Sequence, residues 1–147
     1  MSHKGKVAVV TGAASGIGQA TAIRLRDEGM RVIAVDMNKD ALTKLTGVEH
    51  LVADLSKSED RDKVVAAAQG AHALVNAAGL IRLKPILEFT VQDIRDIYAV
   101  NVEAVWDLTS RIGRTMTEGA SIVNLSSVSA KLATTQETAV YASSKTA

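Results

Sequence analysis

Tyr141 and Lys145 are separated by four positions, so on a helix their side chains would project from the same face. A tyrosine hydroxyl is a poor base at neutral pH, but a neighbouring positive charge such as an ammonium favours the phenolate form. Such a pair could exchange a proton with a bound molecule. The same spacing is common in ordinary surface pairs, so the prediction depends on the other motifs of the chain.

A glycine-rich stretch near the N-terminus is the second candidate: Thr11-Gly12-Ala13-Ala14-Ser15-Gly16-Ile17-Gly18. It lies between the apolar run 7–10 and an amphipathic pattern that begins at Ile17. Glycines let a strand turn sharply into a helix, and they let backbone N–H groups approach a pyrophosphate at the positive end of the helix dipole. The stretch predicts a phosphate site, although turns of small residues also occur without a ligand.

Asp36 ends the apolar stretch 31–36 and follows Gly18 by 18 residues. A dinucleotide-binding fold places a carboxylate near this position, where it accepts hydrogen bonds from the adenosine ribose. A carboxylate would also repel a 2′-phosphate, and neither the glycine stretch nor position 37 carries a basic residue. The sequence therefore favours NAD over NADP. The alternative interpretation is a polar residue in the turn that ends a strand.

Two further polar residues fall at places where chemistry could occur. Asn101 lies on the apolar stripe of a long predicted helix. A buried amide needs partners, so Asn101 either bonds a neighbouring backbone carbonyl or holds a water. Ser127 follows a predicted strand, 14 residues before Tyr141. Its hydroxyl could donate to a substrate carbonyl, or it could serve only in a strand-end turn.

The order of apolar and amphipathic stretches predicts alternating strands and helices. The expected strands are continuously apolar, which is typical of a parallel sheet that is covered on both faces by right-handed crossovers. They are 7–10, 31–36, 50–53, 73–76 and 121–125, and helices are expected from 17, over 39–45, over 57–69, from 90 and over 141–147. We therefore expect an α/β fold with a doubly wound parallel sheet (Rossmann fold) in three layers, and a ligand site at the carboxyl ends of the strands.

The longest predicted helix begins at Thr90, which can cap it, and Asp93 completes an imperfect capping box. Its apolar stripe follows the helical period over about five turns. The predicted stripe comprises Ile94, Ile97, Tyr98, Val102, Val105, Trp106, Thr109 and Ile112.

Composition narrows the class of protein. The 147 residues suit one domain, and the absence of cysteine excludes disulfides and thiolate metal sites or nucleophiles. A formal net charge of +1 with both signs interspersed gives no electrostatic reason to expect a nucleic-acid or membrane partner. No apolar span reaches 18 residues, and the three histidines are scattered, so we expect a cytoplasmic protein without a metal.

Taken together and in order, the motifs resemble those of the short-chain dehydrogenase/reductase family over the whole chain. They are Thr11-Gly-x-x-x-Gly16-x-Gly18, Asp54, Asn76-Ala-Ala-Gly79, Asn101, Asn124-x-Ser-Ser127 and Tyr141-x-x-x-Lys145. The resemblance implies that a cofactor is bound by Gly12, Ser15, Gly16, Ile17, Gly18, Asp36, Asp54, Leu55, Asn76, Ala77, Gly79, Tyr141 and Lys145.

The resemblance also implies hydride transfer between NAD and a secondary alcohol or ketone. Tyr141 would be the acid/base catalyst, while Lys145 would stabilise its phenolate form and bond the nicotinamide ribose. Ser127, as the second serine of its pair, would polarise the substrate oxygen, and Asn101 would hold a water in a proton relay. The alternative is an NAD-binding module or inactive fragment that catalyses nothing.

Two departures from the family pattern qualify the resemblance. The usual Asn-Asn-Ala-Gly appears as Asn76-Ala77-Ala78-Gly79, and only five strands are predicted where the two-halves arrangement has six. We therefore expect residues 1–147 to be the N-terminal part of a longer single-domain chain. The resemblance further implies a homodimer or homotetramer, formed through the surface of the helix that begins at Thr90. The particular alcohol or carbonyl substrate is left open.

Overall fold

The computed structural model describes residues 3–132 and 135–147, and within them five parallel strands form one sheet. The order of the strands is β3-β2-β1-β4-β5, so the winding reverses between β1 and β4. Their bounds are β1 Val7–Thr11, β2 Arg31–Asp36, β3 Glu49–Val52, β4 Ala73–Asn76 and β5 Ser121–Asn124. The predicted doubly wound sheet is confirmed, and β3 begins one residue earlier than predicted.

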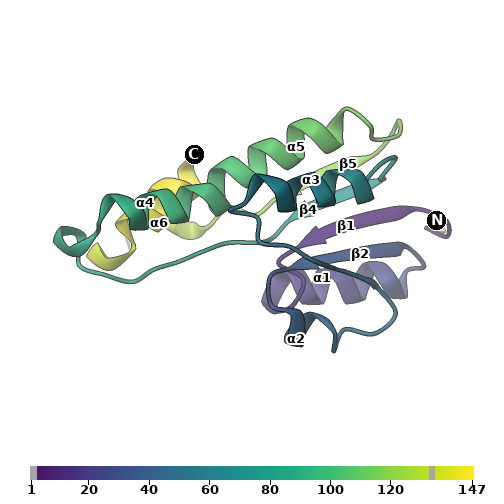
Figure 1. The fold of residues 1–147 in the computed structure, drawn as a ribbon, viewed down its shortest axis with the longest axis horizontal. Helices are drawn as coiled ribbons and strands as arrows, with labels where there is room; N and C mark the ends of the chain where they lie inside the picture. The colour runs from purple at the N-terminus through teal and green to yellow at the C-terminus, as the bar shows by residue number, and fades with distance from the viewer. Residues whose placement is uncertain (1–2, 133–134) are drawn as a thin grey trace.

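Helices cover both faces of the sheet (Figure 1). α1 (Gly16–Asp27) and α2 (Lys39–Leu42) lie on one face, where Ala22 and Leu42 join a buried cluster with Ala8 and Val10 of β1. α3 (Ser58–Ala67) and α5 (Ala104–Gly113) cover the other face and pack around Val9 of the same strand. Because successive side chains of a strand point to opposite faces, the continuously apolar β1 supplies both cores.

One buried arginine fastens α3 to α5. The guanidinium of Arg61, which is 5% exposed, donates to Asp107 and Glu103 at 2.8 Å each and to the Leu55 carbonyl at 3.0 Å. Leu55 belongs to the segment that follows β3. The arginine therefore also holds the carboxyl end of β3 in place.

The predicted long helix exists but changes its hydrogen-bonding pattern midway. α4 (Val91–Tyr98) begins with the predicted capping box, in which Thr90 and Asp93 each accept a bond from the other's backbone N–H. A π-helical turn, Ala99–Glu103, then separates α4 from α5, and the N–H of Ala104 donates to the carbonyl five residues earlier. Such turns are frequent at functional sites.

The apolar stripe predicted for this helix is only partly correct. The buried face carries Ile97, Asn101, Ala104, Leu108 and Ile112, and the last three belong to the core cluster around Val9 of β1. In contrast, Ile94 is 40% exposed and Trp106 is 65% exposed. The helix is apolar on more than one side, and periodicity alone does not tell which side meets the sheet.

α6 (Ala139–Thr146) completes the described structure and lies beside α4, at the end of the molecule away from the N-terminus (Figure 1). Three short 3-10 turns accompany these helices: Ile86–Glu88, Val128–Ala130 and Gln136–Thr138. Across residues 3–132 and 135–147, no helix has the length and apolar character needed to cross a membrane.

Candidate active site

The glycine stretch forms a close turn between β1 and α1. Gly12 has a φ of +66°, and a Cβ at this position would lie 2.7 Å from the backbone nitrogen of Ala78. A Cβ on Gly18 would lie 2.2 Å from the carbonyl oxygen of Gly12. Only glycine fits at either place, so the backbone forms a cradle at the start of α1. Ser15 at its rim makes no capping bond through its hydroxyl.

Thr11 joins this cradle to the neighbouring strand. Its side chain is buried, and Oγ1 accepts hydrogen bonds from the N–H groups of Ala77 and Ala78 at 3.1 Å each. The bonds cross the point where the strand order reverses, which is where doubly wound sheets bind their ligands. The sequence motif contained Thr11 without assigning it a role. The sequence signal that could have identified this role is a polar residue at the end of an otherwise apolar run.

Asp36 braces the cradle from the side of β2. Its Oδ2 accepts from the N–H of Ala14 at 3.0 Å, and its Oδ1 accepts from the N–H of Asn38 at 2.9 Å. The carboxylate therefore lies beside the glycine turn, as the predicted ribose contact requires.

A cleft of about 690 Å³ runs along the carboxyl ends of the strands. Its volume lies within the range of cofactor sites. It is lined by most of the predicted site residues, namely Gly12, Ser15, Gly16, Ile17, Gly18, Asp36, Asp54, Leu55, Ala77, Gly79, Tyr141 and Lys145. Residues that are more than 100 positions apart in the sequence thus share one cleft.

Three predicted residues, Asn76, Ser127 and Asn101, are not among those that line this cleft. Asn76 is 3% exposed, and its Nδ2 donates to Oδ1 of Asn124 at 2.8 Å and to Oγ1 of Thr109 at 3.2 Å. Its side chain ties β4 to β5 and α5. The hydroxyl of Ser127 accepts from the N–H of Ser129 at 3.2 Å. The cofactor role of Asn76 and the substrate role of Ser127 stay predictions.

Asn101 occupies the π-helical turn and is 6% exposed. Its Oδ1 accepts from the N–H of Leu80 at 2.7 Å, and its Nδ2 donates to the carbonyl of Leu80 at 2.9 Å and to Ser144 Oγ at 2.9 Å. Of the two alternatives left open by the sequence, the structure shows the bond to a backbone carbonyl. Both N–H groups of the amide are used within the protein.

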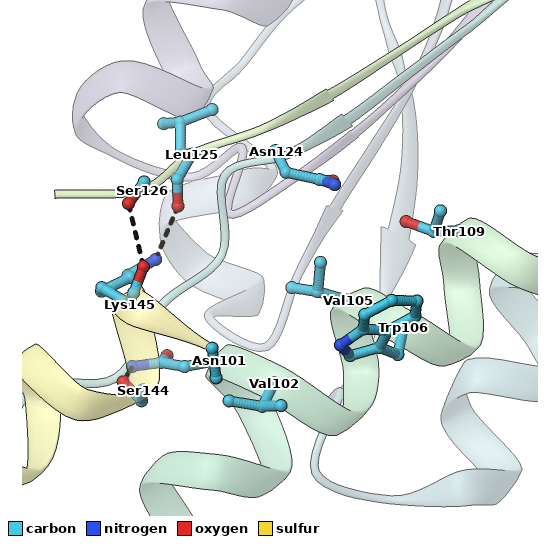
Figure 2. A pocket seen from close by; sticks show the side chains of 11 residues that line it. Asn101, Val102, Val105, Trp106, Thr109, Asn124, Leu125, Ser126, Ser144 and Lys145 are labelled. Atoms are coloured by element: carbon cyan, nitrogen blue, oxygen red, sulfur yellow. Dashed lines mark hydrogen bonds between the residues drawn. The ribbon is translucent and has the colours of Figure 1, made fainter. Parts of the chain in front are cut away.

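Lys145 reaches from α6 to the end of β5. Its Nζ donates to the carbonyl of Leu125 at 3.0 Å, and Figure 2 shows the side chain directed at Leu125 and Ser126. The ammonium lies 5.9 Å from the centre of the Tyr141 ring. Burial lowers the pKa of Lys145, because desolvation penalises its charged form. An anion in the cleft would offset that penalty.

Ser126 lines the cleft next to Lys145, and its hydroxyl donates to the Lys145 carbonyl at 2.9 Å. The same residues also border a smaller cavity of about 300 Å³ between α5, β5 and α6, the region drawn in Figure 2.

A charged cluster fixes one rim of the cleft. Arg82 bridges Asp93 and Asp96 at 2.9 and 2.8 Å, and the first of these carboxylates also pairs with Lys84 at 2.7 Å. The Lys84 ammonium and the bonds from Thr90 hold the pKa of Asp93 well below its usual range. Arg82 and Asp96 line the cleft. No sequence motif had singled them out.

The described part of the chain contains no cluster of three or more histidine, aspartate or glutamate side chains able to hold a metal ion. The cleft instead fits a dinucleotide. A cradle that a Cβ would fill lies at the start of a helix, Asp36 lies beside it, and Tyr141 and Lys145 lie further along the same cleft. Fold and site together define a nucleotide-binding protein of the doubly wound α/β class.

A family model described as short chain dehydrogenase matches residues 6–147. The chain belongs to the short-chain dehydrogenase/reductase family, which confirms the resemblance seen in the sequence motifs.

Two relatives are named for the substrate on which they act. The chain is 37% identical to a D-threitol dehydrogenase of Mycolicibacterium smegmatis, over 95% of this chain and 59% of the relative. It is 35% identical to a D-erythrulose reductase of Gallus gallus, over 100% of this chain and 62% of the relative. The chain thus spans less than two thirds of the length of these relatives.

Solved structures have the same fold and include complexes with either cofactor. A short-chain dehydrogenase/reductase from Burkholderia phymatum in complex with NAD has a TM-score of 0.90 at 28% identity, covering 99% of this chain and 57% of that one. A blue fluorescent protein from a metagenomic library in complex with NADPH has a TM-score of 0.91 at 28% identity, covering 99% and 65%. The neighbours indicate a nicotinamide cofactor and leave the choice between the two forms open.

Proposed function

We propose that the full-length protein is an NAD-dependent oxidoreductase that interconverts a secondary alcohol and a ketone. The observation that carries this proposal is that Tyr141 and Lys145 line the same cleft as the glycine cradle. A proton-transfer pair beside a dinucleotide site is what hydride transfer to or from a carbinol carbon requires.

The proposed roles follow from position. In the oxidative direction, the phenolate of Tyr141 accepts the proton of the substrate hydroxyl, and the Lys145 ammonium, 5.9 Å from the tyrosine ring, stabilises that phenolate. The role of Ser127 follows from the family resemblance rather than from its position: its hydroxyl donates to the substrate oxygen. Bound NAD supplies the acceptor for the hydride that leaves the carbinol carbon. Asn101 braces Leu80 at the cleft through its side chain, and the family resemblance assigns to it a water in a proton relay.

We propose NAD rather than NADP because of Asp36. A carboxylate beside the glycine turn accepts bonds from ribose hydroxyls, and it repels a phosphate of about −1.5 to −2 charge. Calorimetric titration of the full-length protein should give an affinity for NAD at least ten times that for NADP. The variant Asp36→Ala should bring the two affinities closer together. Tighter binding of NADP by the unmodified protein would overturn this assignment.

For the substrate we propose a short polyol or the corresponding ketose. The support is the likeness to relatives named for D-threitol and D-erythrulose, a four-carbon polyol and a four-carbon ketose. The test follows absorbance of the reduced nicotinamide while the full-length protein is supplied with NAD and D-threitol, or with NADH and D-erythrulose. A primary alcohol such as ethanol serves as the matched negative control.

Tight binding of NAD without turnover of any secondary alcohol or ketone would favour the alternative, a dinucleotide-binding module. We also propose that the protein is cytoplasmic and that it forms a homodimer or homotetramer. The reason for proposing an oligomer is that Trp106 is 65% exposed on a helix that the family resemblance places at the subunit interface. Light scattering of the full-length protein distinguishes these assemblies from a monomer.

A further inference from the structure

Ser144 immediately precedes Lys145 and is 3% exposed, whereas its neighbour Ser143 faces solvent. The Ser144 hydroxyl donates to the Tyr141 carbonyl at 2.7 Å and accepts from Nδ2 of Asn101 at 2.9 Å. Figure 2 shows the two side chains in contact between α6 and the π-helical turn. The hydroxyl thereby uses its single donor and one acceptor site.

The contact continues from Asn101 to the cleft. The other bonds of the Asn101 amide go to the N–H and the carbonyl of Leu80, at 2.7 and 2.9 Å. Leu80 and the preceding Gly79 line the cleft. Four hydrogen bonds thus connect the backbone of Tyr141 to the turn after β4, and the only side chains between them are Ser144 and Asn101.

This connection fixes the distance between α6, which carries Lys145, and the turn at Gly79, and that distance matters for the proposed reaction. A Cβ on Gly79 would lie 3.6 Å from Lys145 Nζ, so the turn and the helix are already in close contact. At the adjacent position of α6, the hydroxyl of Tyr98 donates to Ser143 Oγ at 3.0 Å. That second contact does not lead to the cleft. The two adjacent serines therefore offer a matched comparison between a buried hydroxyl that is connected to the cleft and an exposed hydroxyl that is not.

We propose that Ser144 is a positioning residue: its hydroxyl couples the helix of Tyr141 and Lys145, through Asn101, to the Gly79-Leu80 turn. This inference rests on the proposed oxidoreductase function, because the geometry it maintains is that between the proton-transfer pair and the bound cofactor. Reacting groups tolerate displacements of only a fraction of an ångström. Loss of the hydroxyl would leave one N–H of the Asn101 amide without an acceptor in a buried place and would loosen the helix from the turn.

The test uses three variants of the full-length protein: Ser144→Ala, Ser144→Thr and Ser143→Ala. Alanine is a good helix former, so the fold should persist, and thermal unfolding verifies this. For Ser144→Ala we expect kcat with D-threitol to fall at least tenfold, while the affinity for NAD changes less than threefold, because the cradle is untouched. Ser144→Thr retains a hydroxyl and should stay within about threefold of the unmodified kcat, as should Ser143→Ala.

A second measurement does not depend on turnover. Amide hydrogen exchange at Leu80 reports the bond that its N–H donates to Asn101, and in Ser144→Ala we expect this exchange to accelerate about tenfold. Unchanged exchange at Leu80, a kcat within twofold of the unmodified protein, or an equal loss in Ser143→Ala would each overturn the proposal. If the unmodified protein oxidises no secondary alcohol, the proposed function has failed, and exchange at Leu80 alone still decides whether Ser144 supports the turn.

Discussion

Replacing Gly18 by alanine is the most direct perturbation of the phosphate cradle. The added Cβ would lie 2.2 Å from the carbonyl oxygen of Gly12 and 3.0 Å from that of Thr11. Ordinary contacts begin at 3.4 Å. The first turn of α1 and the Thr11-Gly12 backbone must therefore separate by about 1 Å, and a displacement of that size is enough to misplace a binding group.

We expect Gly18→Ala to weaken the binding of the cofactor. The N–H groups of the turn lose their geometry towards a pyrophosphate, and a misplacement of about 1 Å corresponds to a loss of about 100-fold. That factor equals about 2.8 kcal/mol of binding free energy.

The assay is calorimetric titration of NAD into full-length Gly18→Ala, with circular dichroism to verify the fold. Gly113→Ala is the control, because its Cβ would lie 3.6 Å from Ile122 Cδ1, an ordinary contact. An alanine at this last helical position should leave NAD affinity unchanged and stabilise the protein by about 0.5 kcal/mol. A Gly18→Ala protein that binds NAD within threefold of the unmodified affinity would refute the reasoning.

Three further predictions concern contacts around the cleft. In urea titration, Arg61→Met should lower the free energy of unfolding by about 2–3 kcal/mol. This is less than the full cost of breaking a buried ion pair, because the partner Glu103 is 64% exposed. Arg24→Met, which removes an exposed ion pair, should cost about 0.5 kcal/mol or less. Thr11→Val leaves two backbone N–H groups without an acceptor and should cost about 2 kcal/mol in the same titration, while Thr11→Ser, which keeps the hydroxyl, should cost less than half as much. The depressed pKa of Asp93 stabilises the folded state above the ordinary carboxyl pKa of about 4, and this stabilisation is lost as the pH falls below it. Asp93→Asn should therefore destabilise the protein more at pH 7 than near pH 2, and an equal effect at both values would contradict the cause assigned.

The sheet and its ligand edge could be predicted because their signals are local. Continuous apolar runs such as 32–35 indicate burial on both faces of the sheet, and the glycines at 12 and 18 indicate a turn that excludes a Cβ. Once the strands are parallel, their carboxyl ends must meet at one edge. The shared cleft of Asp36, Tyr141 and Lys145 follows from that topology.

The details that depend on tertiary contacts could not be predicted. The π-helical turn around Asn101 changes a hydrogen-bonding register, and a 3.6-residue period carries no trace of that change. The buried face of α5 is chosen by the fit of Ala104 and Leu108 against the sheet rather than by hydrophobicity, which is why Trp106 was assigned to the wrong side. Ser144 looked like an ordinary helical serine until its partner on another helix was known.

The central claim is that Tyr141 transfers the proton in the cleft that binds NAD. The measurement that tests it most directly is steady-state oxidation of D-threitol by full-length Tyr141→Phe, with NAD affinity measured on the same sample and Tyr98→Phe as the control. Removing a general acid/base costs about 10²–10⁴-fold. We expect kcat to fall about 1,000-fold in Tyr141→Phe, with NAD affinity within threefold, and little change in Tyr98→Phe. A Tyr141→Phe protein that keeps more than a tenth of its kcat would contradict the account.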